Sequence, residues 1–247
     1  MTYHVTSPRM ATIAMPVQTI HVSVVFMKRD GKLNHASIVD GCLMSGAEFR
    51  RFKHNDMNDL EHRLQQVPDG AAMLVIADAV FSMDGDVIDL PRLAALCKQY
   101  GAYLMLDEAH ATGLFGEKRR GLAEEFGVAD RIEIQMGTLG KALGAAGGYI
   151  CGSRVLINFL VNCARSFIFS TAPMPAAAAA ATAAIRFVQS DDGEQRRRLL
   201  WQRVDQFISK CKTQNAKPSA IIPLMIGDEN RAVKAAAELR AQGVFIP

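Results

Sequence analysis

The sequence predicts an α/β fold built on a mostly parallel sheet. Short apolar segments alternate with amphipathic segments along the middle of the chain, which is the pattern of strand–helix–strand units. The apolar segments lack a polar alternation, as is typical of strands that helices cover on both faces. The length of 247 residues suits one large domain of this class or two smaller ones.

The expected strands cover residues 71–77, 102–107, 131–136 and 148–152, and the expected helices cover residues 89–101, 122–126, 153–164 and 175–189. Asp89 and Gly101 supply an N-cap and a stop for the first of these helices. Ligands of such sheets bind beyond the carboxyl ends of the strands. We therefore expect the chemistry just after Ala77, Asp107 and Met136.

The two ends of the chain differ from its middle. Residues 1–27 show no sustained period before Val22, so we treat them as a divergent N-terminal segment without an assigned function. Residues 28–190 are expected to form the large domain. Residues 191–247 are expected to begin a smaller α+β domain, with a helix from 191 to about 214, a strand over 220–226, a helix over 231–242 and a strand starting at Val244.

Composition excludes several classes of function. The net charge of +3 is too small to indicate binding to nucleic acid or to an anionic membrane. No apolar run reaches the roughly 18 residues that span a bilayer, and the first residues lack the features of a signal peptide. The five cysteines include no C-x-x-C pair and the histidines have no metal-ligand spacing, so we expect no metal site and a reducing, cytoplasmic setting.

Asp107 and Lys141 are the strongest candidates for chemistry. Asp107 ends an apolar strand, and a magnesium-binding role in a Walker B or DEAH-box NTPase would require an upstream P-loop, which the sequence lacks. Lys141 lies in a glycine-rich segment after the next strand, where close backbone approach is possible. A lysine that forms a Schiff base and an acid that faces a pyridinium nitrogen together suggest pyridoxal 5′-phosphate (PLP).

Other segments are ambiguous when taken alone. His35 could stack on a cofactor ring or begin a helix, and Ser82 lies in a polar turn after the strand over 71–77. Ser170 and Thr171 precede a helix that starts near Pro173, so they could contact a phosphate or simply cap that helix.

Four segments taken together resemble the α-oxoamine synthase family of fold-type I PLP enzymes. They are Leu33-Asn-His-Ala-Ser-Ile-Val-Asp-Gly41, Val80-Phe-Ser-Met-Asp-Gly-Asp86, Leu106-Asp-Glu-Ala-His-Ala-Thr-Gly-Leu-Phe-Gly116 and Gly137-Thr-Leu-Gly-Lys-Ala-Leu-Gly144. Their order and spacing match the family, and the similarity runs from about residue 28 to the end. The resemblance implies an aminotransferase-like large domain over residues 28–190 that binds PLP.

The resemblance also implies roles for individual residues. Lys141 would hold PLP and then act as the base that moves a proton, and Asp107 would pair with the ring nitrogen. His110 would bond to the phenolic oxygen with Ser82 nearby, and His35 would stack on the ring. Thr138 would contact the phosphate, whereas Ser170 and Thr171 would reach the phosphate of a neighbouring subunit, so a homodimer is expected.

Three further segments resemble the family members that condense L-alanine with a pimeloyl thioester, a step of biotin biosynthesis. They are Gly147-Gly-Tyr-Ile-Cys-Gly-Ser-Arg154, Ala164-Arg-Ser-Phe-Ile-Phe-Ser-Thr171 and Ile221-Ile-Pro-Leu-Met-Ile-Gly-Asp228. The implied reaction releases CO2 and the thiol, whether coenzyme A or a carrier protein. The alternatives are another α-oxoamine synthase, such as 2-amino-3-ketobutyrate CoA ligase, or a non-catalytic homologue or partner subunit.

The chain also departs from the family. Family members carry a long segment before the block at Asn34, including a turn and helix start that hold the PLP phosphate, and they continue beyond the point that matches Pro247. On this comparison we expect the chain to correspond to the central part of a synthase, shortened at both ends.

Overall fold

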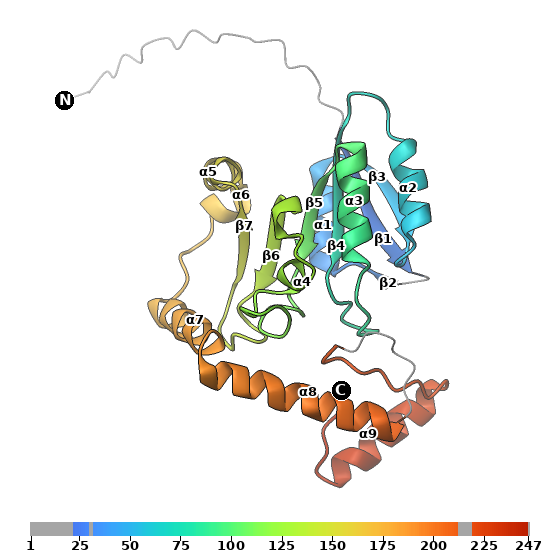
Figure 1. Ribbon diagram of the computed structural model, residues 1–247, viewed down its shortest axis with the longest axis vertical. Coiled ribbons are helices and arrows are strands. Elements are labelled where there is room, and N and C mark those ends of the chain that lie inside the picture. The colour runs from blue at the N-terminus through green and yellow to red at the C-terminus, as the bar shows by residue number, and fades with distance from the viewer. Residues whose placement is uncertain (1–21, 30–31, 212–218, 247) are drawn as a thin grey trace, which may run out of the picture.

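The computed structural model describes residues 22–29, 32–211 and 219–246. A seven-stranded sheet forms its centre, in the order β2-β1-β4-β5-β6-β7, and β3 also pairs with β1 (Figure 1). The strands are β1 (Val22–Arg29), β2 (Lys32–Leu33), β3 (Glu48–Lys53), β4 (Ala72–Asp78), β5 (Tyr103–Asp107), β6 (Ile134–Thr138) and β7 (Gly148–Gly152). β1, β3, β4, β5 and β6 run parallel, whereas β2 and β7 are antiparallel to their neighbours. The predicted α/β fold with a mostly parallel sheet is confirmed.

The helices follow the strands in the expected alternation. They are α1 (Ala36–Ser45), α2 (Met57–Gln65), α3 (Leu90–Tyr100), α4 (Leu122–Glu125), α5 (Arg154–Cys163), α6 (Arg165–Ile168), α7 (Pro175–Val188), α8 (Asp191–Cys211) and α9 (Glu229–Ala241). Asp89 caps α3, since its side chain accepts a hydrogen bond from the Arg92 amide, and Gly101 ends that helix in the left-handed conformation, as predicted. Within the described part of the chain, no helix is long and apolar enough to cross a membrane.

The strand period of two residues divides the core between the two faces of the sheet. Side chains such as Val75 and Leu104 enter the larger core cluster, which α2 and α3 cover with residues that include Leu60 and Leu93. The adjacent residues along the strands face the other side, where Ile76 packs in a smaller cluster with α1. Both faces of β4 are therefore covered, and this explains the unbroken apolar run that predicted it.

Two boundaries differ from those expected. β1 starts at Val22, within the segment set apart at residues 1–27, and pairs with both β3 and β4; residues 1–21 lie outside the described residues. β6 starts at Ile134 and not at residue 131, because residues 129–131 form a 3₁₀ turn. The side chain of Glu133 accepts a hydrogen bond from the Leu104 amide at 2.7 Å, so pairing of β6 with β5 begins one residue later.

The strand predicted over 220–226 is wrong, and residues 244–246 also lie outside any strand. Pro223 has no amide hydrogen to donate to a ladder. Ile221 instead packs against the larger core cluster, while Met225 is 88% exposed. The predicted helix from residue 191 is confirmed as α8 to Cys211, and its expected last turn lies outside the described residues.

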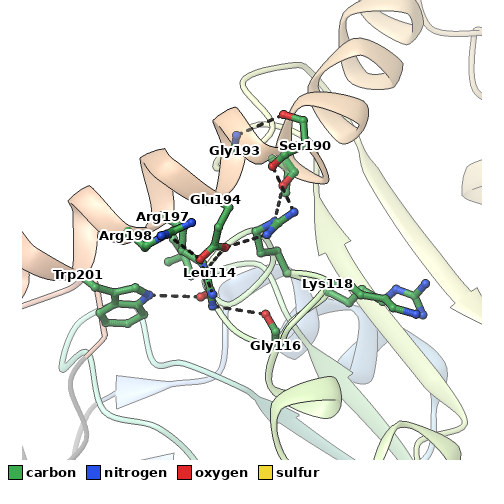
Figure 2. Close-up of polar contacts among 12 residues, drawn as sticks. Leu114, Gly116, Lys118, Ser190, Gly193, Glu194, Arg197, Arg198 and Trp201 are labelled. Atoms are coloured by element: carbon green, nitrogen blue, oxygen red, sulfur yellow. Dashed lines mark hydrogen bonds and ion pairs between the residues drawn. The ribbon is translucent and has the colours of Figure 1, made fainter.

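α8 is attached to the loop after β5 by a network of polar contacts (Figure 2). Glu194 forms ion pairs at 2.8 Å with Arg119 of the loop and with Arg197 of α8. Arg119 also donates through Nε to the Val188 carbonyl, and Trp201 Nε1 donates to the Leu114 carbonyl at 3.4 Å. The network therefore joins α8 to the loop that follows Asp107 in the chain.

Candidate functional site

Two buried carboxyl groups end neighbouring strands at one edge of the sheet. Asp78 is the last residue of β4 and Asp107 the last residue of β5, and the two are directly paired in the strand register. They are only 8% and 7% exposed, respectively. One carboxylate oxygen of Asp107 accepts a hydrogen bond from the Ala109 amide at 2.8 Å. This edge is the carboxyl end of the parallel strands, where ligands of α/β sheets bind.

Lys141 and His110 contact each other beside this edge. Lys141 Nζ lies 2.6 Å from His110 Nε2. Burial lowers the pKa of His110, and the charge of Lys141 lowers it further, so the imidazole is disposed to be neutral and to accept a hydrogen bond from Lys141. Burial also lowers the pKa of Lys141, although the charges of Asp107 and Asp78 oppose this effect. A lysine with a lowered pKa has a larger neutral fraction and is a better nucleophile.

The Lys141 loop is closed by its own backbone. The Leu139 amide donates to the Gly147 carbonyl at 2.8 Å, and the Ala145 amide donates back to Leu139 at 2.7 Å. Gly113, with φ at +87°, lets the loop after β5 approach closely, since a Cβ there would lie 2.9 Å from that of Ala142. These two loops therefore bring His110 and Lys141 together although they are 31 positions apart.

His35 occupies the start of α1. Its Nδ1 lies 2.8 Å from Ser37 Oγ and accepts a hydrogen bond from the Ser37 amide at 3.4 Å, so the side chain caps the helix. The preceding residue, Asn34, is buried and donates from Nδ2 to the Ile76 carbonyl of β4 at 3.2 Å. His35 also lies within electrostatic reach of His110, whose pKa its charge lowers. His35 therefore caps α1, as one of the two interpretations predicted, and it also lies near His110.

Thr138 and Ser82 lie on loops at the same edge of the sheet. Thr138 ends β6, and its hydroxyl accepts a hydrogen bond from the Gly140 amide at 3.1 Å and donates to the Gly147 carbonyl at 3.2 Å. Ser82 is exposed on the turn after β4, which is closed by the hydrogen bond from the Gly85 amide to the Phe81 carbonyl at 2.8 Å. Thr138 thus holds the Lys141 loop, whereas contacts among the described residues do not join Ser82 to the cluster.

Ser170 and Thr171 are exposed on the segment between α6 and α7. Contacts among the described residues of this single chain do not bring them to Lys141. α7 begins at Pro175 and is not capped by a side chain, so the capping interpretation of the two hydroxyls is wrong. Their expected contact with a neighbouring subunit stays a prediction.

The sequence analysis missed two buried acids beside the site. Asp78 directly follows the apolar strand, at the position where ligands were expected, and that position is the signal that could have identified it. Glu108 follows Asp107 and is 2% exposed. Its carboxylate accepts hydrogen bonds from the amides of Leu122 and Ala123 at 2.9 and 2.8 Å, so it stabilises the start of α4. Burial raises the pKa of each acid to about 7.

The chain is similar to known proteins over nearly all of its length. The 8-amino-7-oxononanoate synthase of Geobacter sulfurreducens is 47% identical over 227 residues, which are 90% of this chain and 57% of that protein. The synthase of Anaeromyxobacter dehalogenans is 47% identical over 216 residues, 87% of this chain and 54% of that protein. The chain thus spans little more than half the length of the curated relatives it matches.

The chain is also similar to solved structures over nearly all of its length. Serine palmitoyltransferase of S. paucimobilis, with a bound PLP–myriocin aldimine, matches with a TM-score of 0.84 and 29% identity, over 92% of this chain and 58% of that one. The 8-amino-7-oxononanoate synthase of Francisella tularensis matches with a TM-score of 0.77 and 26% identity, over 92% of this chain and 65% of that one. The aminotransferase class I and II model matches residues 31–247, and the chain therefore belongs to the aminotransferase class I and II family.

Proposed function

We propose that this chain acts as a PLP-dependent 8-amino-7-oxononanoate synthase, which condenses L-alanine with a pimeloyl thioester and releases CO2 and the thiol. The observation that carries the proposal is the joint placement of Lys141, His110 and Asp107 at the carboxyl edge of the sheet. The 47% identity to synthases of this name over 90% of the chain supports the choice of reaction.

The residues at this edge fit PLP. The lowered pKa of Lys141 suits an amine that reacts with the aldehyde of the cofactor. Asp107 offers a buried carboxylate that would pair with the protonated ring nitrogen. His110 would bond to the phenolic oxygen, with Ser82 near that oxygen, and His35 would stack on the ring. Thr138 would contact the phosphate from its own chain, and Ser170 and Thr171 would do so from a partner subunit.

Each residue of the site has a separate role in the proposed reaction. PLP, when bound, supplies the electron sink that makes the α-proton of an amino acid acidic. Lys141 Nζ takes that proton, and His110 Nε2, at 2.6 Å, keeps the amine oriented and accepts its hydrogen bond. Asp107 keeps the ring nitrogen protonated. Asn34 fixes the turn that carries His35 to β4.

The proposed reaction differs from those of other family members in its amino acid and its acyl donor. Curated relatives named 8-amino-7-oxononanoate synthase reach 47% identity over 90% of this chain. Their name supports L-alanine as the amino acid and this synthase reaction over that of 2-amino-3-ketobutyrate CoA ligase. Turnover separates the synthase from a non-catalytic partner.

The proposal includes a homodimer. Large apolar side chains are exposed on α5, α6 and the segment before α7, including Phe159 at 61%, Phe167 at 64% and Phe169 at 72%. Exposed apolar patches of this kind mark protein contacts. They flank Ser170 and Thr171, which the proposal assigns to the partner's cofactor. Sedimentation equilibrium should give twice the mass of the chain, and a monomer at micromolar concentration would contradict this part.

The proposal places the enzyme in the cytoplasm. Cys42, Cys97, Cys151, Cys163 and Cys211 all carry free thiols. Free cysteines are typical of reducing compartments. Fractionation of the producing cells, followed by detection of the chain, tests the location.

Turnover of the full chain with a panel of substrates tests the proposed reaction. The chain, saturated with PLP, is mixed with pimeloyl-coenzyme A or pimeloyl-carrier protein and with L-alanine, glycine or L-serine, and the amino ketone is identified by mass spectrometry. We expect product with L-alanine at least tenfold faster than with the other two. Preference for glycine would favour the ligase, and no product from a folded, PLP-bound chain would favour the non-catalytic alternative.

A further inference from the structure

Asp78 is a buried acid to which the proposed reaction assigns no task. It ends β4 directly opposite Asp107 of β5, and it is 8% exposed. Its Oδ1 is buried and has no hydrogen-bond partner among the described residues. An unpartnered buried polar atom is costly and calls for an explanation. The position of Asp78 and its unpartnered oxygen both suggest that this acid has a role at the carboxyl edge of the sheet.

The two paired acids are not equivalent. The Ala109 amide donates to Asp107 at 2.8 Å, and a hydrogen bond of this kind stabilises the ionised carboxylate. No such donor reaches Oδ1 of Asp78 among the described residues. Two neighbouring buried carboxyl groups do not both ionise readily, so the less stabilised one retains a proton.

The charges around Asp78 come from three other elements. Burial and the charge of Asp107 raise its pKa, whereas the charges of Lys141 and His54 lower it, and the net result is a pKa of about 7. Lys141 lies on the loop after β6, and His54 follows β3, where its Nε2 lies 2.7 Å from Asp86. The pKa of Asp78 therefore depends on these neighbouring charges. Removal of Asp107 should lower it, and removal of Lys141 should raise it.

We infer that Asp78 holds the single proton of the buried carboxyl pair and thereby acts as a positioning residue for Asp107. With Asp78 neutral, Asp107 faces the site without a second negative charge beside it. This inference rests on the proposed function, because it is the ring nitrogen of PLP that Asp107 would face. When a positive charge arrives beside Asp107, Asp78 becomes easier to ionise, so the midpoint of its titration falls.

Carboxyl titration of the full chain without cofactor tests the inference. The chain is labelled with ¹³C only at aspartate, which excludes Glu108, and is followed by NMR from pH 4 to pH 9. We expect one carboxyl resonance with a midpoint near 7 in the unsubstituted chain, and its loss in Asp78→Asn. Loss of that resonance in Asp107→Asn with retention in Asp78→Asn would place the proton on Asp107 and overturn the inference.

Two further variants keep the test decisive even if Asp78→Asn does not fold. Asp107→Asn removes a negative neighbour and should lower the midpoint, whereas Lys141→Ala removes a positive neighbour and should raise it, each by about half a pH unit or more. Asp130→Asn, an exposed substitution, is the matched control and should leave the midpoint unchanged. No aspartate midpoint above about pH 5.5, or shifts in the opposite directions, would overturn the inference.

The outcome separates this inference from the proposed function. The titration uses no PLP, so a chain that fails to bind the cofactor can still show the shared proton. Conversely, if the chain binds PLP through Lys141 but shows no raised aspartate midpoint, the proposed function stands and the inference about Asp78 is overturned. In a PLP-binding chain, added PLP should lower the midpoint of the same resonance, and an unchanged midpoint would overturn the inference.

Discussion

At the scale of single residues, the site depends on charges that the fold holds away from water. Asp107 is 7% exposed and accepts a hydrogen bond from the Ala109 amide. A hydrogen bond to a charged partner is worth about 1.5–3 kcal/mol. Asp107→Asn removes the charge and keeps the shape, so we expect the apparent affinity for PLP to fall about tenfold or more, measured by titration of the visible absorbance.

Asp130→Asn is the control for that prediction, because Asp130 is an exposed acid on the turn before β6. It should bind PLP as the unsubstituted chain does. Equal affinity of Asp107→Asn and Asp130→Asn would show that Asp107 does not pair with the cofactor.

The sequence identified some site residues and missed others for physical reasons. Asp107 and Lys141 were predicted because an acid after an apolar strand and a lysine among glycines are local patterns. Asp78 also follows an apolar strand, but its burial arises from the pairing of β4 with both β1 and β5. That pairing is a tertiary property, so the position of Asp78 after the apolar run is a local signal, whereas its burial is not encoded locally.

At the scale of elements, Glu108 connects the strand that carries Asp107 to α4. Gly121, which precedes α4, offers no side-chain cap, and Glu108 instead accepts hydrogen bonds from the Leu122 and Ala123 amides. Glu108→Gln places an amide NH2 against one of these two donors. We expect the free energy of unfolding at pH 6 to fall by about 1–3 kcal/mol, measured by urea denaturation. Glu117→Gln, an exposed neighbour, should change it by less than about 0.5 kcal/mol.

The network around Glu194 connects α8 to the loop after β5 (Figure 2). The hydrogen bond from Arg197, with a further one from Arg119, lowers the pKa of Glu194 to about 2. The folded chain therefore favours ionised Glu194, and this contribution is present above pH 4.5 and lost as the pH falls toward 2. We expect Glu194→Gln to increase amide hydrogen exchange in the first turns of α8 and in residues 114–120 at pH 7.

The exposed pair of Lys234 and Glu238 on α9 provides the control for that experiment, since its two charged groups lie 3.9 Å apart and are mostly exposed. Glu238→Gln should leave exchange in α8 unchanged, as surface ion pairs contribute little. Equal exchange in Glu194→Gln and Glu238→Gln would contradict the connecting role of Glu194.

Element types were predictable where local patterns decide them, and unpredictable where partners decide them. The period and the caps of α3 identify that helix from its own residues. The direction of β7 follows from a short return from β6, which places it antiparallel, and no residue within β7 specifies this. The apolar run over 220–226 resembles a strand but pairs with no strand among the described residues, so it stays irregular.

At the scale of the whole molecule, the buried acids should make stability depend on pH. Burial raises the pKa values of Asp78 and Glu108 to about 7, so the folded chain keeps protons that the unfolded chain releases above pH 4–5. Their contribution to stability is greatest below that range. It decreases by up to about 1.4 kcal/mol for each unit and each group as the pH rises to about 7, and it levels off above that.

The double variant Asp78→Asn with Glu108→Gln tests this dependence. Urea denaturation from pH 5 to pH 8 should show the unsubstituted chain losing stability relative to the double variant as the pH rises. Parallel profiles for the two proteins would contradict the assignment of raised pKa values to these acids.

The most direct test of the proposed function is the visible absorbance spectrum of the purified chain with added PLP, recorded beside Lys141→Ala. Lys141 should bind the cofactor covalently, so the unsubstituted chain should show an absorbance band of lysine-bound PLP that Lys141→Ala lacks. An identical spectrum for the two folded proteins would contradict the proposal that Lys141, beside His110 and Asp107, forms a PLP site.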